Sequence, residues 1–122
     1  MGQATPFKPM ALVVEEDEND RAMVAMLLEE CEMGVIQCDN ADIAMEVLAR
    51  VGPMLTMLYT DVSPAGEVDG IALAQAAQKS YPDLRVIVTG REMRVELPEH
   101  ALFMPKPLLP LNVLREAERC RY

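Results

Sequence analysis

The sequence predicts an α/β domain in which a doubly wound, parallel sheet of five strands is covered by helices on both faces. Short apolar runs alternate along the chain with longer segments of helical periodicity, the pattern of successive strand–helix–strand units. The chain has 122 residues, 51% of them hydrophobic, which suits one compact domain with its own core. Residues 1–10 are small and polar with two prolines, so we expect a flexible tail followed by one domain over residues 11–122.

The first three elements follow from hydrophobic patterning. Ala11–Val14 is apolar throughout, as expected for a strand that is buried on both faces. Asp20–Glu32 has apolar residues at helical spacing, and either Asp17 or Asn19 precedes it as a suitable N-cap. Val35–Cys38 is a second, weaker strand.

The middle of the chain repeats this alternation. Ala41–Val51 is helical in period, and Gly52-Pro53 ends it. Leu55–Thr60 is a third apolar strand that closes on an acidic residue. A loop rich in proline and glycine comes next, and the alanine-rich segment Ile71–Ser80 is the third helix.

The last part of the chain contains two strands in succession. Leu84–Val88 is apolar, Ala101–Met104 is a short fifth strand, and Leu111–Cys120 is a final helix with a clear apolar stripe. The connection between Thr89 and Phe103 is short, charged and interrupted by a proline. We therefore expect no more than a short fourth helix in this connection.

Composition excludes several classes of function. Acidic residues outnumber basic ones by 20 to 11, and a net charge of -9 repels phosphate backbones and anionic lipids, so we expect neither direct nucleic-acid nor membrane binding. A single histidine argues against a histidine-based metal cluster or a Ser-His-Asp triad. Three scattered cysteines and the lack of an apolar span or leader favour a cytoplasmic protein.

The residues that follow the predicted strands carry the chemistry. Glu15 and Glu16 follow the first strand, Asp61 the third and Thr89 the fourth, and Lys106 comes after the fifth. The carboxyl ends of parallel strands meet at one edge of a sheet, so these side chains should share one site. Neighbouring carboxylates repel one another unless a cation lies between them, and hard oxygen ligands favour Mg²⁺ or Mn²⁺.

The same set of side chains suits the transfer of a phosphoryl group. Asp61 is a nucleophile whose attack on phosphorus would be assisted by a metal ion and by the Lys106 ammonium, because both neutralise the negative charge that develops. The Thr89 hydroxyl can donate a hydrogen bond to the acyl phosphate that results.

At these positions the chain resembles the receiver domain of two-component response regulators, a flavodoxin-like fold. The resemblance covers nearly all of the chain from Ala11 to Arg121. It is carried by the segments LVVEE (Leu12–Glu16), YTD (Tyr59–Asp61), VDG (Val68–Gly70), VIVTG (Val86–Gly90) and FMPKP (Phe103–Pro107).

The resemblance implies a phosphoacceptor that receives its phosphoryl group from a histidine kinase or a histidine phosphotransfer protein. The resemblance does not imply a conventional enzyme. It implies a domain that, with Mg²⁺, takes a phosphoryl group from phosphohistidine onto itself and then slowly hydrolyses its own acyl phosphate. It also implies a cis peptide bond before Pro107. The implied roles are phosphoacceptor for Asp61, metal ligands for Glu15 and Glu16 and the main-chain carbonyl of Ser63, switch hydroxyl for Thr89, phosphate-pairing ammonium for Lys106, and phosphorylation-dependent rotamer for Phe103.

The sequence departs from the pattern of the family in places that leave alternatives open. The acidic pair is Glu-Glu, whereas the second acid of the family is usually Asp, and a register that uses Glu16-Asp17 remains an alternative. Pro64 also falls one position early in its loop. A second interpretation is a binding module of the same fold that works without phosphorylation. A third, an aspartyl-phosphate hydrolase of the haloacid dehalogenase type, needs an acid where this chain has Ser63.

Overall fold

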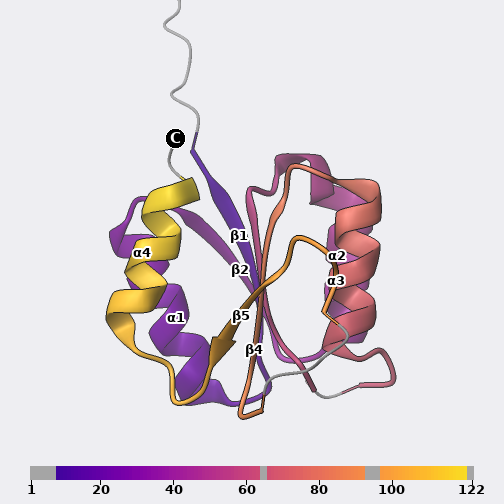
Figure 1. Cartoon of the computed structure of the whole chain (residues 1–122). Coiled ribbons are helices and arrows are strands. Elements are labelled where there is room, and N and C mark those ends of the chain that lie inside the picture. The colour runs from indigo at the N-terminus through magenta and orange to yellow at the C-terminus, as the bar shows by residue number, and fades with distance from the viewer. Residues whose placement is uncertain (1–7, 64–65, 93–96, 121–122) are drawn as a thin grey trace, which may run out of the picture.

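A computed structural model of the chain describes residues 8–63, 66–92 and 97–120. Five parallel strands form one sheet in the order β2-β1-β3-β4-β5, so β3 lies at its centre between β1 and β4 (Figure 1). This is the doubly wound α/β fold that the sequence predicts. The strands are β1 (Met10–Val14), β2 (Gly34–Cys38), β3 (Met57–Asp61), β4 (Arg85–Gly90) and β5 (Leu102–Pro105).

The helices cover the sheet in two layers. Helices α1 (Glu18–Glu30) and α4 (Pro110–Cys120) lie together on one face, and α2 (Ala41–Val51) and α3 (Gly70–Ser80) lie on the other (Figure 1). A single 3-10 turn, η1 (Gly52–Met54), follows α2. No helix among the described residues is long and apolar enough to cross a membrane.

The alternation of side chains along the central strands divides the core into two parts. In β1, Leu12 and Val14 pack toward α2 and α3, whereas Ala11 and Val13 pack toward α1 and α4. All four side chains are fully buried. Continuous apolar runs mark these strands because both faces of the sheet are covered by helices.

Most element boundaries lie within two residues of the predicted ones, and helix capping explains the largest shift at a helix start. Helix α1 begins at Glu18, two residues before the predicted Asp20, because the Asp17 side chain caps it by accepting a hydrogen bond from the Asp20 amide. Asp17 is therefore the N-cap, and Asn19 lies inside the helix. Strand β1 begins at Met10, the last residue of the expected tail and one residue before the predicted strand.

Backbone pairing, not hydrophobicity, sets the ends of the strands. The predicted strand over Leu84–Val88 extends to Gly90, because Thr89 and Gly90 still pair with β5. The strand predicted to start at Leu55 begins at Met57, because Leu55 caps the preceding 3-10 turn by donating its amide to the Gly52 carbonyl and Thr56 forms a bend.

The connection between β4 and β5 has no regular structure in its described part. Residues 91–92 form bends, and residues 97–100 include a turn, so no helical residue is present in these two stretches. Leu97 and Ala101 pack against the core beneath α2 and α3. The unusual Pro64 of the preceding loop lies outside the described residues, as do residues 93–96.

Candidate functional site

The structure brings three of the predicted side chains into direct contact at the carboxyl edge of the sheet. Glu15 follows β1, Asp61 is the last residue of β3, and Lys106 follows β5. The Lys106 Nζ atom lies 2.7 Å from Glu15 Oε1 and 3.4 Å from Asp61 Oδ1. One ammonium therefore bridges the ends of two central strands.

The backbone around Lys106 directs its side chain to this place. The Lys106 amide donates a hydrogen bond of 2.9 Å to the Gly90 carbonyl, which ties the residue to the end of β4. The Lys106–Pro107 peptide bond is cis, as the resemblance implies.

The two glutamates of the acidic pair have different environments. The Glu15 side chain is 3% exposed, and its Oε2 atom accepts a hydrogen bond of 3.1 Å from the Asp17 amide. The Glu16 side chain is exposed and forms no hydrogen bond or ion pair with another described residue. Arg21 instead donates to the main-chain carbonyls of both glutamates, at 2.9 and 3.4 Å. Glu15 is thus held in the site, whereas Glu16 is held only through its backbone.

Thr89 lies beside Asp61 with its hydroxyl free. The two residues are register partners in the pairing of β3 with β4. Thr89 is fully buried, and its Oγ1 atom has no hydrogen-bond partner among the described residues. A buried hydroxyl without a partner costs free energy, so its presence here needs a reason.

Phe103 and Ser63 also lie near this edge of the sheet. Phe103 is half-buried on β5, and a Cβ atom added to Gly90 would meet its ring at 3.5 Å. Ser63 is exposed in the loop after β3, two residues after Asp61.

Gly70 permits the close approach of α3 to the end of β3. Its amide donates a hydrogen bond of 3.0 Å to the Val62 carbonyl, and a Cβ atom at this position would lie 1.9 Å from the Asp61 carbonyl oxygen. Any larger residue must displace the backbone of Asp61. The Asp69 side chain starts the helix at this point by accepting from the Ala72 amide.

The charges of the site affect two ionisable groups. Partial burial would lower the pKa of Lys106, but the hydrogen bond that its ammonium donates to Glu15 and the charges of Glu15 and Asp61 outweigh burial and raise the pKa above its usual value. Burial raises the pKa of Tyr59, and the charges of Glu15, Asp20 and Asp61 raise it further. Lys106 is therefore firmly cationic and the Tyr59 phenol stays neutral.

The donors of the site suit a hard divalent cation. Among the described residues, no three acidic, histidine or cysteine side chains form a group that could hold a metal ion. Mg²⁺ does not need such a group, because it usually takes one or two carboxylates together with waters and phosphate oxygens. Glu15 and Asp61 already converge on one cation, the Lys106 ammonium. The chemistry of these donors therefore fits Mg²⁺ or Mn²⁺.

One acidic residue of this region was not singled out from the sequence. Asp20 Oδ2 lies 3.9 Å from Lys106 Nζ. The sequence shows Asp20 only as the start of an amphipathic helix, one acid among several in an acidic segment. A helix that begins directly after the first strand has its first turn at the edge of the sheet where the strands end. This position in the sequence could have indicated that Asp20 lies near the other predicted site residues.

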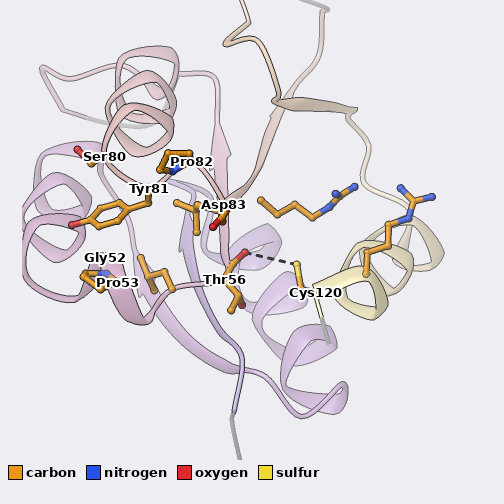
Figure 2. A pocket seen from close by; sticks show the side chains of 12 residues that line it. Gly52, Pro53, Thr56, Ser80, Tyr81, Pro82, Asp83 and Cys120 are labelled. Carbon is orange, nitrogen blue, oxygen red and sulfur yellow. Dashed lines mark hydrogen bonds between the residues drawn. The ribbon is translucent and has the colours of Figure 1, made fainter. Parts of the chain in front are cut away.

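A cavity of about 670 Å³ lies at the other end of the sheet, where β3 and β4 begin and where α2, α3 and α4 end. Tyr81, Pro82 and Asp83 line one side of it, and the Cys120 thiol donates a weak hydrogen bond to the Thr56 carbonyl (Figure 2). None of the predicted site residues lines this cavity.

Comparison with known proteins identifies the fold. No family model matches the sequence, and no curated protein matches it. Among solved structures, a response regulator receiver domain protein from Clostridium thermocellum matches with a TM-score of 0.81 at 14% identity, over 92% of this chain and 93% of that one. The chemotaxis response regulator CheY4 of Vibrio cholerae matches at 0.77 and 16%, over 93% and 98% of the two chains. The receiver domain of NtrX from Brucella abortus matches at 0.75 and 23%, over 90% and 96%.

Proposed function

Since this chain has the receiver-domain fold of response regulators, we propose that it is a phosphoacceptor module of a two-component signalling system, phosphorylated on Asp61. The observation that carries the proposal is the contact of the Lys106 ammonium with both Asp61 and the buried Glu15. A lysine held by two strand-end carboxylates is expected where negative charge must be neutralised during a reaction.

The chemistry follows from these positions. An Asp61 carboxylate oxygen attacks phosphorus, a P–O bond forms, and the bond from phosphorus to the imidazole nitrogen of a donor phosphohistidine breaks. Lys106 neutralises charge on the transferred oxygens, and the free Thr89 hydroxyl donates a hydrogen bond to one of them. Mg²⁺ or Mn²⁺, when bound by Glu15, Glu16, Asp61 and the Ser63 carbonyl, supplies further positive charge to the same oxygens.

The partners belong to the same proposal. The phosphoryl donor is a histidine kinase or a histidine phosphotransfer protein, and both donor and acceptor act in the cytoplasm. The chain has a net charge of -9, in keeping with a protein donor and not a nucleic acid. A downstream protein partner reads the phosphorylated state.

The test is chemical labelling. We expect acetyl phosphate with Mg²⁺ to add one phosphoryl group, measured by intact mass, and we expect Asp61→Asn to abolish the addition. Lys106→Ala should slow labelling strongly, because it removes the ammonium that neutralises charge on the transferred oxygens. Equal labelling of the Asp61→Asn variant contradicts the proposal.

One observation favours a second candidate, a binding module of the same fold that works without phosphorylation. Lys106 already compensates charge on Glu15 and Asp61, and the Glu16 side chain forms no hydrogen bond or ion pair with another described residue. Such a module would bind its partner equally well as wild type and as Asp61→Asn, and it would not be labelled by acetyl phosphate.

A further inference from the structure

The loop that follows Asp61 is attached to helix α2 by one carboxylate. Asp42 lies in the first turn of α2, and both of its side-chain oxygens accept hydrogen bonds from the backbone of this loop. Oδ2 accepts from the Glu67 amide at 3.2 Å, and Oδ1 accepts from the Val68 amide at 3.0 Å. The two donors are adjacent in sequence, so a single side chain fixes both the position and the direction of this part of the loop.

Gly66 completes the fit between the loop and Asp42. Its φ angle of 116° lies in the region that favours glycine, and a Cβ atom there would lie 2.9 Å from Asp42 Oδ2. A side chain at this position would therefore strain the backbone and also displace the carboxylate. Three successive loop residues are thus matched to one exposed acid, which the sequence shows only as an ordinary acid in the first turn of a helix.

The two ends of the same loop lie beside the phosphoacceptor. The Val62 amide donates a hydrogen bond of 2.7 Å to the Thr89 carbonyl, and the Gly70 amide donates one of 3.0 Å to the Val62 carbonyl. The loop therefore leaves and re-enters the fold next to Asp61. The Asp61 side chain is only 16% exposed, so a donor has little room and a change in the course of the loop alters that room.

The outer part of the loop has no other polar anchor in its described residues. For residues 63 and 66–68, the two bonds to Asp42 are the only hydrogen bonds to another described residue. Val68 also packs against the core beneath α2 and α3, on the face to which Asp42 holds the loop. Loss of the carboxylate would therefore free the backbone at residues 66–67 and let the loop occupy more conformations.

We propose that Asp42 is a positioning residue for phosphoryl transfer: by holding the loop on α2, it keeps the approach to Asp61 open for the donor. The inference rests on the proposed function, because it concerns access to the same carboxylate. Asp42 acts only through the loop, so what it sets is the fraction of molecules whose loop leaves Asp61 open. Two hydrogen bonds to a charged acceptor keep this fraction high, and their loss should slow labelling about three- to tenfold.

The test compares protection of the loop with labelling in the full chain. Exchange rates of the Glu67 and Val68 amides are measured by NMR, and labelling of Asp61 by acetyl phosphate with Mg²⁺ is followed by intact mass. We expect Asp42→Ala to speed exchange of both amides and to slow labelling about three- to tenfold. Asp42→Asn keeps one acceptor oxygen, so it should restore part of both the protection and the labelling rate.

Two further variants make the test specific to this contact. Glu46→Ala is the matched control, because Glu46 is an exposed acid one turn further along α2 and its loss changes the net charge equally. It should leave both measurements unchanged. Gly66→Ala disrupts the contact from the side of the loop and keeps the Asp42 carboxylate, so it should slow labelling as Asp42→Ala does. The double variant should be no slower than the slower single variant, because both changes remove the same interaction.

The outcomes separate this inference from the proposed function. Labelling of Asp42→Ala at the wild-type rate overturns the inference, and so do unchanged exchange rates of the two amides. An equal slowing by Glu46→Ala also overturns it, because that would indicate a general effect of net charge. In each case labelling of the wild type leaves the proposed function intact. If the wild type is not labelled at all, the proposed function is wrong, and this role of Asp42 is wrong with it.

Discussion

The buried hydroxyl of Thr89 is the residue whose energetics point most directly to a function. Thr89 is fully buried, and its Oγ1 atom has no hydrogen-bond partner among the described residues. Its position in register with Asp61 gives the hydroxyl a partner once phosphoryl oxygens are present. Under the proposed function, this polar group would be unsatisfied in the resting state and satisfied in the phosphorylated state.

This argument predicts an unusual mutational effect. Thr89→Val replaces the hydroxyl by a methyl group of similar size, so it removes a desolvation cost without losing a hydrogen bond. We expect the free energy of unfolding, measured with urea, to stay equal or to rise by up to about 1 kcal/mol. A decrease in the free energy of unfolding of more than about 1 kcal/mol would mean that the hydroxyl has a partner, such as a bound water, in the resting state.

At the scale of elements, Gly70 joins the start of α3 to the end of β3. Alanine normally stabilises a helix relative to glycine, but here its Cβ atom would lie 1.9 Å from the Asp61 carbonyl oxygen, which is backbone and has little room to move. We expect Gly70→Ala to lower the free energy of unfolding by about 1–3 kcal/mol through overpacking.

A second glycine provides the control for this prediction. A Cβ atom at Gly34 would meet the Met10 sulfur, the far end of a flexible side chain that can turn away. Gly34→Ala should therefore cost less than Gly70→Ala in the same urea titration. If the two variants lose equal stability, the close approach of α3 to β3 is not the cause.

Helix α4 is tied to the sheet by a buried carboxylate. Glu116 is 5% exposed, and it accepts hydrogen bonds from Arg85 on β4 and from Arg119 on its own helix. The sequence shows Glu116 as one of several charges on a helix that should carry them on its outer face. Charge pairing across the two elements, and not amphipathicity, decides its place.

Removal of this carboxylate should loosen α4. We expect Glu116→Ala to lower the free energy of unfolding by about 1.5–3 kcal/mol, the usual contribution of hydrogen bonds to a charged group. Arg119→Ala should lower it by less than about 1 kcal/mol, because the Arg119 side chain is largely exposed. Equal effects of the two variants in guanidinium unfolding would show that the contact with Arg85 contributes little.

At the scale of the whole molecule, the connection between β4 and β5 is where a signal would emerge. Phosphorylation adds about -1.5 to -2 charges at Asp61. Thr89 can bond the new oxygens only by moving inward, and Phe103 on the neighbouring strand can turn into the space behind it. The described residues of the connection, 91–92 and 97–100, form bends and a turn, so little packing must be broken for them to reorder.

Amide hydrogen exchange measures this response. We expect beryllofluoride with Mg²⁺ to change protection both around Asp61 and across residues 90–103. Thr89→Val is the control: it should bind the same mimic but lose the change across residues 90–103. Changes that stay confined to the surroundings of Asp61 in the wild type would exclude this route from phosphorylation to output.

The amino-acid sequence by itself determined the order of the elements, the doubly wound sheet and the residues at its carboxyl edge. Apolar runs and helical periodicity are local signals, and in a parallel sheet the residue after each strand is placed at a common edge by topology. The receiver-type segments around Glu15, Asp61, Thr89 and Lys106 were therefore visible before any coordinates. The cis bond before Pro107 followed from the same resemblance.

Tertiary structure alone decided which of these side chains touch. Strand register placed Thr89 beside Asp61, the cap at Asp17 brought Asp20 toward Lys106, and a cross-element ion pair drew Glu116 inward. It also separated Glu15, which is buried against Lys106, from Glu16, which is exposed. Distances between side chains depend on pairing and packing over the whole chain, and a difference of one residue in register or helix start turns a side chain to another face. Local sequence patterns do not carry that information.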